Sequence, residues 1–454
     1  MADDILRAIN RCKPNEPLEP GDDRFVDFDG VRGVAVQSRM LRFLEAANAD
    51  RSYAHIAFAG HRGGGKSTEL YRVVESVEKH GHITLFAKVT DEADSKEVSF
   101  SDVFRLMIRK LEERFGHLAA THAGVEAAFH TVARWFEETT ELKQEQVERT
   151  LQLGLDIAAG GNVDAEGEAG APGAKVKFKT GLGRILAAIG IQRQSRTTER
   201  QEIRRKIEQY PDALLENLNL LLSEIRATGE VQRLLFVLDN VDRYVPEVVN
   251  DVFLRNAGLF TAVEAHLIFT VPISLLYNPV EDAVSERYQT LTLPMLPVFL
   301  SKTRTVNADV VDRIEEAVYR RVAETLFVSR EVVRGLIVAS GGCWRDLLRL
   351  IQSALMETIT RVGEAEASRA VRVVRGEFTR PITRAHYGVL ASVHLDKRID
   401  PTRNNQWLLF HRVVLEYNGD GWVDVHPLVE ATDEFAEALA NERRARSLPG
   451  GSTQ

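Results

Sequence analysis

The segment from Gly60 to Ser67, GHRGGGKS, constrains this chain more than any other part of its sequence. It matches the pattern G-x-x-x-x-G-K-[ST], in which glycines let the backbone curl so that successive N–H groups point at phosphate oxygens. In such a loop Lys66 reaches the β- and γ-phosphates, and the Ser67 hydroxyl completes the shell of a magnesium ion. The motif therefore predicts that the chain binds a nucleoside triphosphate together with Mg²⁺.

The residues around this loop favour the same interpretation. A short apolar run at 54–59 predicts a buried strand, and apolar residues recur at helical spacing after Lys66. A second strand is predicted at 83–89, which completes the strand, turn, helix and strand of a parallel βαβ unit. The positive end of the helix dipole adds to anion binding. The predicted nucleotide-binding residues are Gly60, His61, Arg62, Gly63, Gly64, Gly65, Lys66, Ser67 and Thr68. For Arg62 three roles are open: contact with a phosphate, contact with a neighbour, or the solvated surface position that is commoner for a loop arginine.

A second acidic motif follows the apolar run at 234–238. Such a run is typical of a strand buried on both faces, and an acid at its carboxyl end projects into the ligand crevice. Asp239 is thus the candidate Walker B residue, which would hold magnesium through water. The next residue is Asn240, whose amide orients water but accepts no proton, so we expect slow hydrolysis. Two roles are open to Asp242: activation of water, or capping and salt-bridging of the following helix.

Composition and charge bound the remaining function classes. The 454 residues carry a formal net charge of -8, which argues against a chain coated in nucleic acid but allows a local basic patch. The N-terminus lacks the layout of a secretory signal and no apolar stretch is long enough to span a bilayer, so we expect a cytoplasmic protein. Cys12 and Cys343 form no metal or disulfide pattern. Three histidines near the C-terminus, at 394, 411 and 426, also match no metal-ligand spacing.

The chain divides into five predicted regions. These are an N-terminal lead at 1–50, a core at 51–300 with a mostly helical insertion at about 100–230, a helical region at 301–380, a region at 381–442 and a disordered tail at 443–454. Within the insertion, alternating residues at 151–157 and 175–179 flank a Gly- and Ala-rich tip and predict a hairpin. This hairpin could lie on its own domain, or contact a partner or a membrane.

The region at 381–442 is predicted to form a winged helix, a variant of the helix-turn-helix. Helices are predicted near 383–395 and 404–411, and strands at 413–417 and 422–425 flank the turn Asn418-Gly419-Asp420-Gly421.

Together the segments GHRGGGKST, LLFVLDNVDR, LIFTVP and GGCWRDLLRL resemble the AAA+/STAND group of P-loop NTPases. The order of parts resembles origin-recognition-type ATPases. The segment LDNVDR and the large insertion are similar to KAP-type NTPases, although Asn240 departs from their pattern and their membrane helices are lacking. The resemblance implies an α/β fold: a parallel-sheet P-loop NTPase core with a helical insertion, a helical lid and a C-terminal winged-helix-like domain.

The same resemblance implies roles for residues outside the loop. Thr270 would occupy the sensor 1 position, and Arg345 would be the sensor 2 arginine that contacts the γ-phosphate from the lid. Arg287 would present an arginine finger. Plain alternatives are a lid salt bridge for Arg345 and a surface position for Arg287. The adenine would lie near the N-terminal segment 25–32, and ATP is preferred over GTP.

Three functions compete. The first is a STAND-type ATP switch with slow hydrolysis, which controls self-assembly or a protein partner; bacterial proteins of this kind often serve antiphage defence. The second is a DNA-binding ATPase of the initiator or transposition-regulator type. Five arginines between 369 and 384 favour DNA, whereas Glu416, Asp420 and Asp424 place negative charge on the predicted wing. The third, a metabolic kinase, leaves the lid and winged helix without a role.

Overall fold

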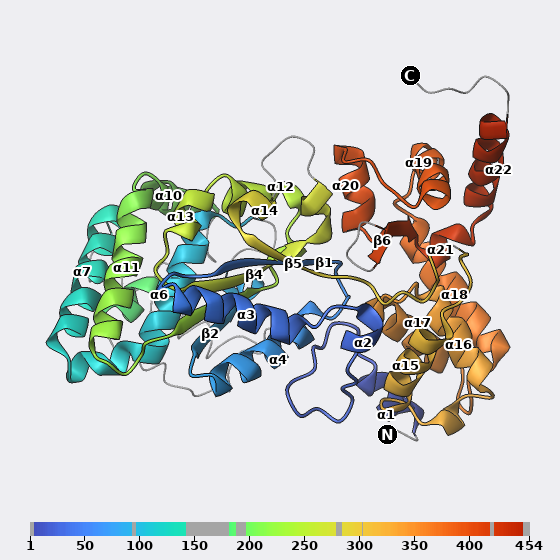
Figure 1. The fold of residues 1–454 in the computed structure, drawn as a ribbon, viewed down its shortest axis with the longest axis horizontal. Coiled ribbons are helices and arrows are strands. Elements are labelled where there is room, and N and C mark those ends of the chain that lie inside the picture. Colours follow the sequence, from blue (N-terminus) through green and yellow to red (C-terminus); the bar gives the residue numbers. More distant parts are fainter. Residues whose placement is uncertain are drawn as a thin grey trace. The chain divides into compact units, whose positions relative to one another are not determined.

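The computed structural model describes residues 4–92, 97–141, 181–187, 197–277, 284–301, 303–417 and 422–447. Its central feature is a five-stranded sheet in the order β2-β3-β4-β1-β5 (Figure 1). The strands are β1 (His55–Gly60), β2 (Ile83–Lys88), β3 (Leu234–Asp239), β4 (His266–Pro272) and β5 (Gln289–Leu293). The pairings β1–β5, β2–β3 and β3–β4 are parallel. The predicted α/β fold class with a parallel-sheet core is confirmed.

The chain forms two compact units. Unit 1 combines 1–46, 56–77 and 270–454, and unit 2 combines 47–55 and 78–269. The phosphate loop, the helical lid and the winged-helix-like domain therefore belong to unit 1. The strands β2 and β3 and the insertion belong to unit 2.

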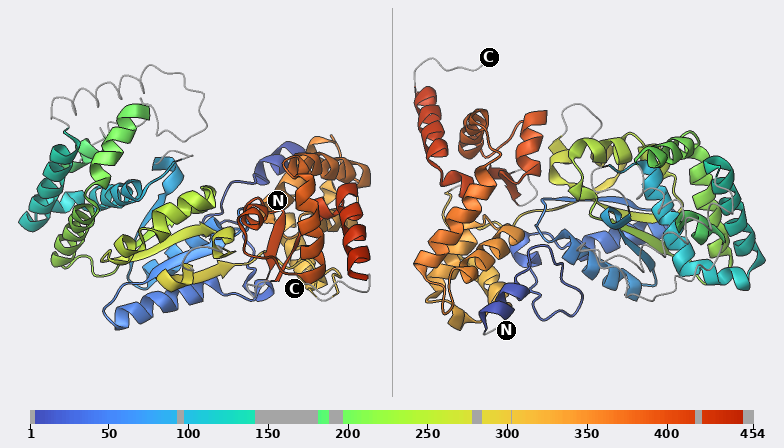
Figure 2. Two further views of the ribbon diagram at one scale, coloured as in Figure 1. Left: turned by 90° about the horizontal axis from the view of Figure 1, so that it is seen from above. Right: turned by 180° about the vertical axis from the view of Figure 1, so that it is seen from behind.

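Unit 2 contains the predicted helical insertion. Its long helices are α6 (Phe100–Phe115), α7 (Ala123–Thr140), α10 (Thr197–Glu208) and α11 (Pro211–Ala227), and they pack against one another (Figure 2). α10 and α11 are separate helices because Pro211 has no N–H to continue α10 and begins α11 instead. Shorter elements are α5 (Val89–Glu92), η1 (Gly116–Ala120), η2 (Val241–Arg243), α12 (Pro246–Val249), η3 (Asn250–Leu254) and α13 (Ala257–Thr261). The hairpin predicted around 158–174 lies outside the described residues.

In unit 1 the N-terminal helices are α1 (Ile5–Arg11), α2 (Asp29–Arg32), α3 (Val36–Ala49) and α4 (Lys66–Lys79). After β4 come η4 (Ile273–Tyr277) and α14 (Val284–Arg287). The lid consists of α15 (Ala308–Tyr319), η5 (Glu324–Leu326), α16 (Arg330–Ala339), α17 (Trp344–Met356) and α18 (Glu364–Thr379). Strong amphipathic patterns form these helices, and their buried faces meet between α16, α17 and α18.

The winged-helix-like domain contains α19 (Arg384–Asp396), α20 (Arg403–Phe410), β6 (Val414–Tyr417), β7 (Trp422–Val425), α21 (Pro427–Glu430) and α22 (Asp433–Ser447). The strands β6 and β7 pair antiparallel, as predicted, while the turn 418–421 lies outside the described residues. The tail predicted to be disordered from 443 is helical to Ser447. Pairing of Arg446 with Asp396 and Glu442 accounts for the extra turn.

Two expected absences can be examined in the described part of the chain. No helix there has the length and apolar character to cross a bilayer. No group of three or more His, Cys, Asp or Glu side chains in these ranges is placed to hold a metal ion. Cys12 and Cys343 are both buried free thiols, and burial raises the pKa of each to about 12.

Candidate functional site: the phosphate loop and its cavity

The loop between β1 and α4 has the backbone that its glycines permit. Gly63 and Gly65 have φ angles of 82° and 102°, in the left-handed region that favours glycine. At Gly60 the limit is space, because a Cβ would lie 2.8 Å from the carbonyl oxygen of Leu293. A Cβ on Gly63 would clash with the Cβ of Arg345. Three of the loop glycines are therefore required by conformation or by close approach.

Lys66 begins α4 with its side chain directed back over the loop. Its Nζ donates to the carbonyl oxygens of Gly60 and His61, at 2.7 and 2.9 Å. The residue is only 5% exposed, so its ammonium lies within the curl of the loop rather than in solvent. Ser67 and Thr68 follow in the first turn, where backbone N–H groups and the helix dipole favour an anion. Thr68 Oγ1 accepts a hydrogen bond from the backbone N–H of Leu18 at 3.1 Å.

The loop residues His61, Arg62 and Gly63 contact the C-terminal part of unit 1. The Nε2 of His61 accepts a hydrogen bond from the backbone N–H of Glu416, in β6, at 2.8 Å. The guanidinium of Arg62 lies 5.3 Å from the ring centroid of Phe410, the last residue of α20. The carbonyl of Gly63 accepts from the backbone N–H of Arg345, in α17, at 3.2 Å. The lid and the winged-helix-like domain are thus in direct contact with the loop.

Glu416 is a junction within these contacts. Besides donating to His61, its carbonyl accepts from the backbone N–H of Met295 at 3.0 Å, and its carboxylate accepts from the hydroxyl of Tyr277 at 2.6 Å. The residue is 4% exposed. Tyr277 ends η4, which follows β4, and Met295 follows β5, while His61 follows β1. The strand β6 is therefore bound to three segments that each lead from the end of a sheet strand.

His61 is neutral in this environment. Burial, with the nearby positive charges of Lys66 and Arg412, lowers the pKa of His61 to about 3. The neutral ring can accept at Nε2, whereas a protonated ring would carry a hydrogen there and could not accept from Glu416. The loop contact therefore depends on an uncharged imidazole.

A cavity of about 490 Å³, its mouth included, lies beside the loop. Its floor is formed by Gly64, Gly65 and Thr68, and its walls come from the N-terminal segment and the lid. The aromatic rings of Phe28 and Trp344 lie 5.9 Å apart and give it an apolar side. A mostly apolar lining with a few polar groups is typical of small-molecule sites. Phe25 and Phe28, from the segment 25–32 that is predicted to lie near the adenine, line this cavity.

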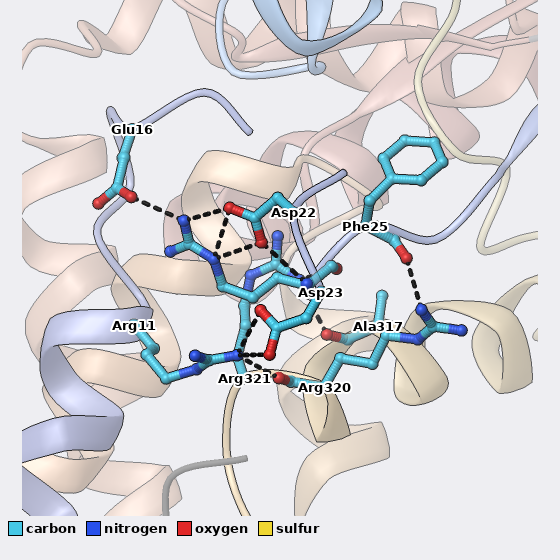
Figure 3. A network of polar contacts seen from close by, with 9 residues as sticks. Arg11, Glu16, Asp22, Asp23, Phe25, Ala317, Arg320 and Arg321 are labelled. Atoms are coloured by element: carbon cyan, nitrogen blue, oxygen red, sulfur yellow. Dashed lines mark hydrogen bonds and ion pairs between the residues drawn. The ribbon is translucent and has the colours of Figure 1, made fainter. Parts of the chain in front are cut away.

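A polar network ties the N-terminal segment to the lid (Figure 3). Arg321 donates to the carbonyl oxygens of Arg24 and Ala317 at 3.0 and 2.9 Å, and Arg320 donates to that of Phe25 at 2.9 Å. Arg24 is itself paired with Asp22 and Glu16, and Arg11 contacts Asp23 and the carbonyl of Arg320. Two cavity walls that lie almost 300 residues apart in sequence are thereby joined.

The acidic motif of β3 belongs to unit 2. Asp239 ends the strand and is 1% exposed, and its Oδ1 accepts from the backbone N–H of Asn240 at 2.7 Å. Asn240 has a φ of 66°, and its Nδ2 donates to Thr90 Oγ1 at 3.0 Å. The amide is therefore oriented by Thr90. Asp242 is 7% exposed in η2. The Asp239 carboxylate offers oxygen ligands, the type that Mg²⁺ prefers.

The three residues assigned by resemblance occupy different environments. Arg345 follows the first residue of α17, and its Cδ and Nε lie 3.4 Å from the position of a Cβ on Gly63, so it lies next to the loop. Thr270 is fully buried within β4. Arg287 ends α14 and is largely exposed to solvent. Of these, the structure brings Arg345 to the phosphate loop; the functional roles of all three remain predictions.

Several features of this site have no signal in the sequence. His61 is predicted from sequence only as a nucleotide-binding loop residue, and its contact with Glu416 spans 355 residues. Trp344 and Arg321 line the cavity from the lid, and Glu69 follows the loop as a helix residue.

The two described wing carboxylates, Glu416 and Asp424, do not place negative charge on the surface. Asp424 is fully buried, ion-paired with Lys397 and Arg304 and hydrogen-bonded to His394, and these contacts lower its pKa. The prediction that these two acids place negative charge on the wing is therefore wrong at its surface, because both side chains are buried and engaged by partners.

The comparisons with known proteins give similarity at the level of structure alone. No protein-family model and no curated protein matches the chain. The chain is similar to the crystal structure of Cdc6p from Pyrobaculum aerophilum, at 10% identity and a TM-score of 0.36, over 92% of this chain and 99% of that one. It is also similar to the Orc1 protein of Aeropyrum pernix in complex with DNA, at 13% identity and a TM-score of 0.37, over 96% and 98%. Likeness at these scores carries no conclusion about function.

Proposed function

We propose that the chain is an ATP-binding switch of the STAND/AAA+ type with slow hydrolysis. The nucleotide sets how firmly the lid and the winged-helix-like domain are held against the phosphate loop. This state in turn controls self-assembly or engagement of a protein partner. The observation that carries the proposal is the contact of three consecutive loop residues, His61 to Gly63, with α17, α20 and β6.

The proposed mechanism assigns a role to each group. The loop N–H groups and Lys66 bind the phosphates, and Mg²⁺ is held by Ser67 and, through water, by Asp239. Arg345 contacts the γ-phosphate, so ATP strengthens lid docking more than ADP does. Thr270 senses the phosphate, and Arg287 acts on a neighbouring copy. Turnover is slow because Asn240 orients water without accepting its proton and Asp242 is the remaining candidate base.

Substitution of the loop lysine tests this proposal. We expect Lys66→Ala to abolish ATP binding in calorimetry and to remove every ATP-dependent change in molecular mass measured by light scattering. Lys79→Ala is the matched control, since Lys79 is an exposed lysine in the last turn of the same helix. The wild-type protein should change mass, or its stability, with ATP and a non-hydrolysable analogue but less with ADP. Identical behaviour of wild type and Lys66→Ala with ATP would reject the switch.

A DNA-binding ATPase is the second candidate, supported by exposed arginines. Arg372, Arg380 and Arg384 are exposed on α18, after it and at the start of α19. Arg369 and Arg375 are instead engaged by Glu357, Glu366 and the carbonyl of Ala431. Phosphate contacts by exposed arginines would give salt-dependent binding. A mobility shift with duplex DNA at low salt, weakened by added salt and by Arg380→Ala, would support this candidate, and no shift at low salt would exclude it.

A further inference from the structure

Arg32 lies at the base of the cavity in an unusual state for an arginine. It is the last residue of α2, followed by Gly33 with a φ of 71°. Its side chain is 4% exposed, and it forms part of the cavity wall with Gly64, Gly65 and Thr68. Arginine is rarely buried to this degree unless it is paired or binds an anion. The hydrogen-bond partners of its guanidinium therefore indicate the role of Arg32.

The partners inside the described chain satisfy the guanidinium only in part. Its Nη2 donates to the carbonyl of Gly64 at 2.7 Å, and its Nη1 contacts Glu69 Oε1 at 3.4 Å. Glu69 is also engaged by Arg72, at the shorter distance of 3.0 Å. The buried Nε–H of Arg32 has no hydrogen-bond partner among the described residues. Burial lowers the pKa of Arg32, and the nearby carboxylate of Glu69 opposes this shift.

We propose that Arg32 is a phosphate-binding residue, which contacts the nucleotide phosphates nearest the ribose. The proposal rests on the proposed nucleotide-binding function of the loop. The residue lines the same floor as Gly65 and Thr68, whose position at the start of α4 is where those phosphates would lie. Nη2 is 3.6 Å from the position of a Cβ on Gly65, so the guanidinium is adjacent to the loop backbone. A guanidinium can bind a phosphate with two parallel N–H groups, which would satisfy its free Nε–H.

A purely structural role makes a different prediction. If Arg32 only fixes the N-terminal segment to the carbonyl of Gly64, its removal would disturb the base side of the cavity. The affinities for adenosine and for ADP would then fall by the same factor. If Arg32 binds phosphate, the loss is confined to ligands that carry phosphates.

Competition binding on the full chain separates the two roles, with fluorescent ADP as the reporter and ADP and adenosine as competitors. We expect Arg32→Ala to weaken ADP binding by about 10- to 100-fold, the worth of a hydrogen bond to a charged group. Adenosine binding should change by less than about twofold within the scatter of surface substitutions. Arg72→Ala is the matched control, because Arg72 pairs with the same Glu69 but is not part of the cavity wall. It should leave the ratio of ADP to adenosine affinity unchanged.

The outcomes are distinguishable from failure of the proposed function. If wild type binds no nucleotide, both ideas fail. If wild type binds ADP and Arg32→Ala binds it equally well, or loses adenosine and ADP equally, only the role of Arg32 is overturned. If Arg32→Ala does not fold, as judged by the absence of a cooperative unfolding transition, Arg32→Lys and Arg32→Gln are measured in its place. The lysine variant, which keeps the charge, must bind ADP more tightly than the glutamine variant, and equal affinities would overturn the proposal.

Discussion

At the scale of single residues, His61 shows how an ordinary loop position can acquire a specific role. Its imidazole is 2% exposed and accepts from the backbone of β6 only while it is neutral. The charges of Lys66 and Arg412 act in the same direction as burial and keep the proton away. The hydrogen bond between His61 of the phosphate loop and Glu416 of β6 should therefore be lost when acid protonates His61.

The pH dependence of the free energy of unfolding tests whether His61 must be neutral in the folded chain. The pKa of His61 is about 3 in the folded chain and near 6.5 when unfolded, so the unfolded state binds more protons as the pH falls below 6.5. Stability from this residue is complete above pH 6.5 and is lost as the pH falls toward 3, by about 2 kcal/mol at pH 5. His61→Gln keeps an acceptor but does not titrate, so its urea-unfolding midpoint should fall less between pH 7 and 5. His130→Gln, at a side chain 70% exposed, is the control. If the urea-unfolding midpoints of wild type and His61→Gln fell equally between pH 7 and 5, the low pKa assigned to His61 would be contradicted.

At the scale of elements, the start of α17 is held by a buried ion pair. Arg412 Nε and Nη2 donate to the two carboxylate oxygens of Asp346, at 3.0 and 3.1 Å, and Asp346 is fully buried. These charge-assisted contacts hold the pKa of Asp346 far below its usual range. Because Asp346 follows Arg345, the pair links the segment after α20 to the part of the lid that touches the loop.

Breaking this pair should cost much more than breaking an exposed one. We expect Arg412→Ala to destabilise the chain by about 3–5 kcal/mol, since it leaves Asp346 buried without its main partner. Arg446→Ala removes a comparable two-oxygen pair with Asp396, but that pair is about half exposed and should cost at most about 1 kcal/mol. Urea-unfolding midpoints of the two variants give the comparison. If the two variants lost similar free energies of unfolding, burial of Asp346 would not be what makes its pair with Arg412 strong.

The elements were predictable where the pattern was local. The runs at 54–59 and 234–238 form β1 and β3 within one residue, because a strand buried on both faces needs a continuous apolar stretch. The glycine-rich loop was readable because its backbone demands glycine at Gly63 and Gly65. The helical extension to Ser447 was missed, since its stabilisation by Asp396 is 50 residues distant. The contact of the loop with Glu416 was not predictable for the same reason, whereas the place of Arg345 beside the loop followed from the family resemblance alone.

At the scale of the whole molecule, unit 1 is assembled from three separate stretches of chain around the phosphate loop. The N-terminal segment, the lid and the winged-helix-like domain all reach the loop or its cavity. A bound nucleotide would therefore act on several elements together, and contacts made better with ATP than with ADP would shift the balance between docked and released states.

Hydrogen exchange of the Glu416 amide, which donates to His61, tests this central claim most directly. With saturating ATP and Mg²⁺, the account predicts that peptides containing residues 414–417 exchange about tenfold more slowly, which corresponds to a coupling free energy of about 1.4 kcal/mol. ADP should give a smaller effect, and Lys66→Ala none. Unchanged exchange in β6 of wild-type protein to which ATP is demonstrably bound would contradict the coupling of the loop to the winged-helix-like domain.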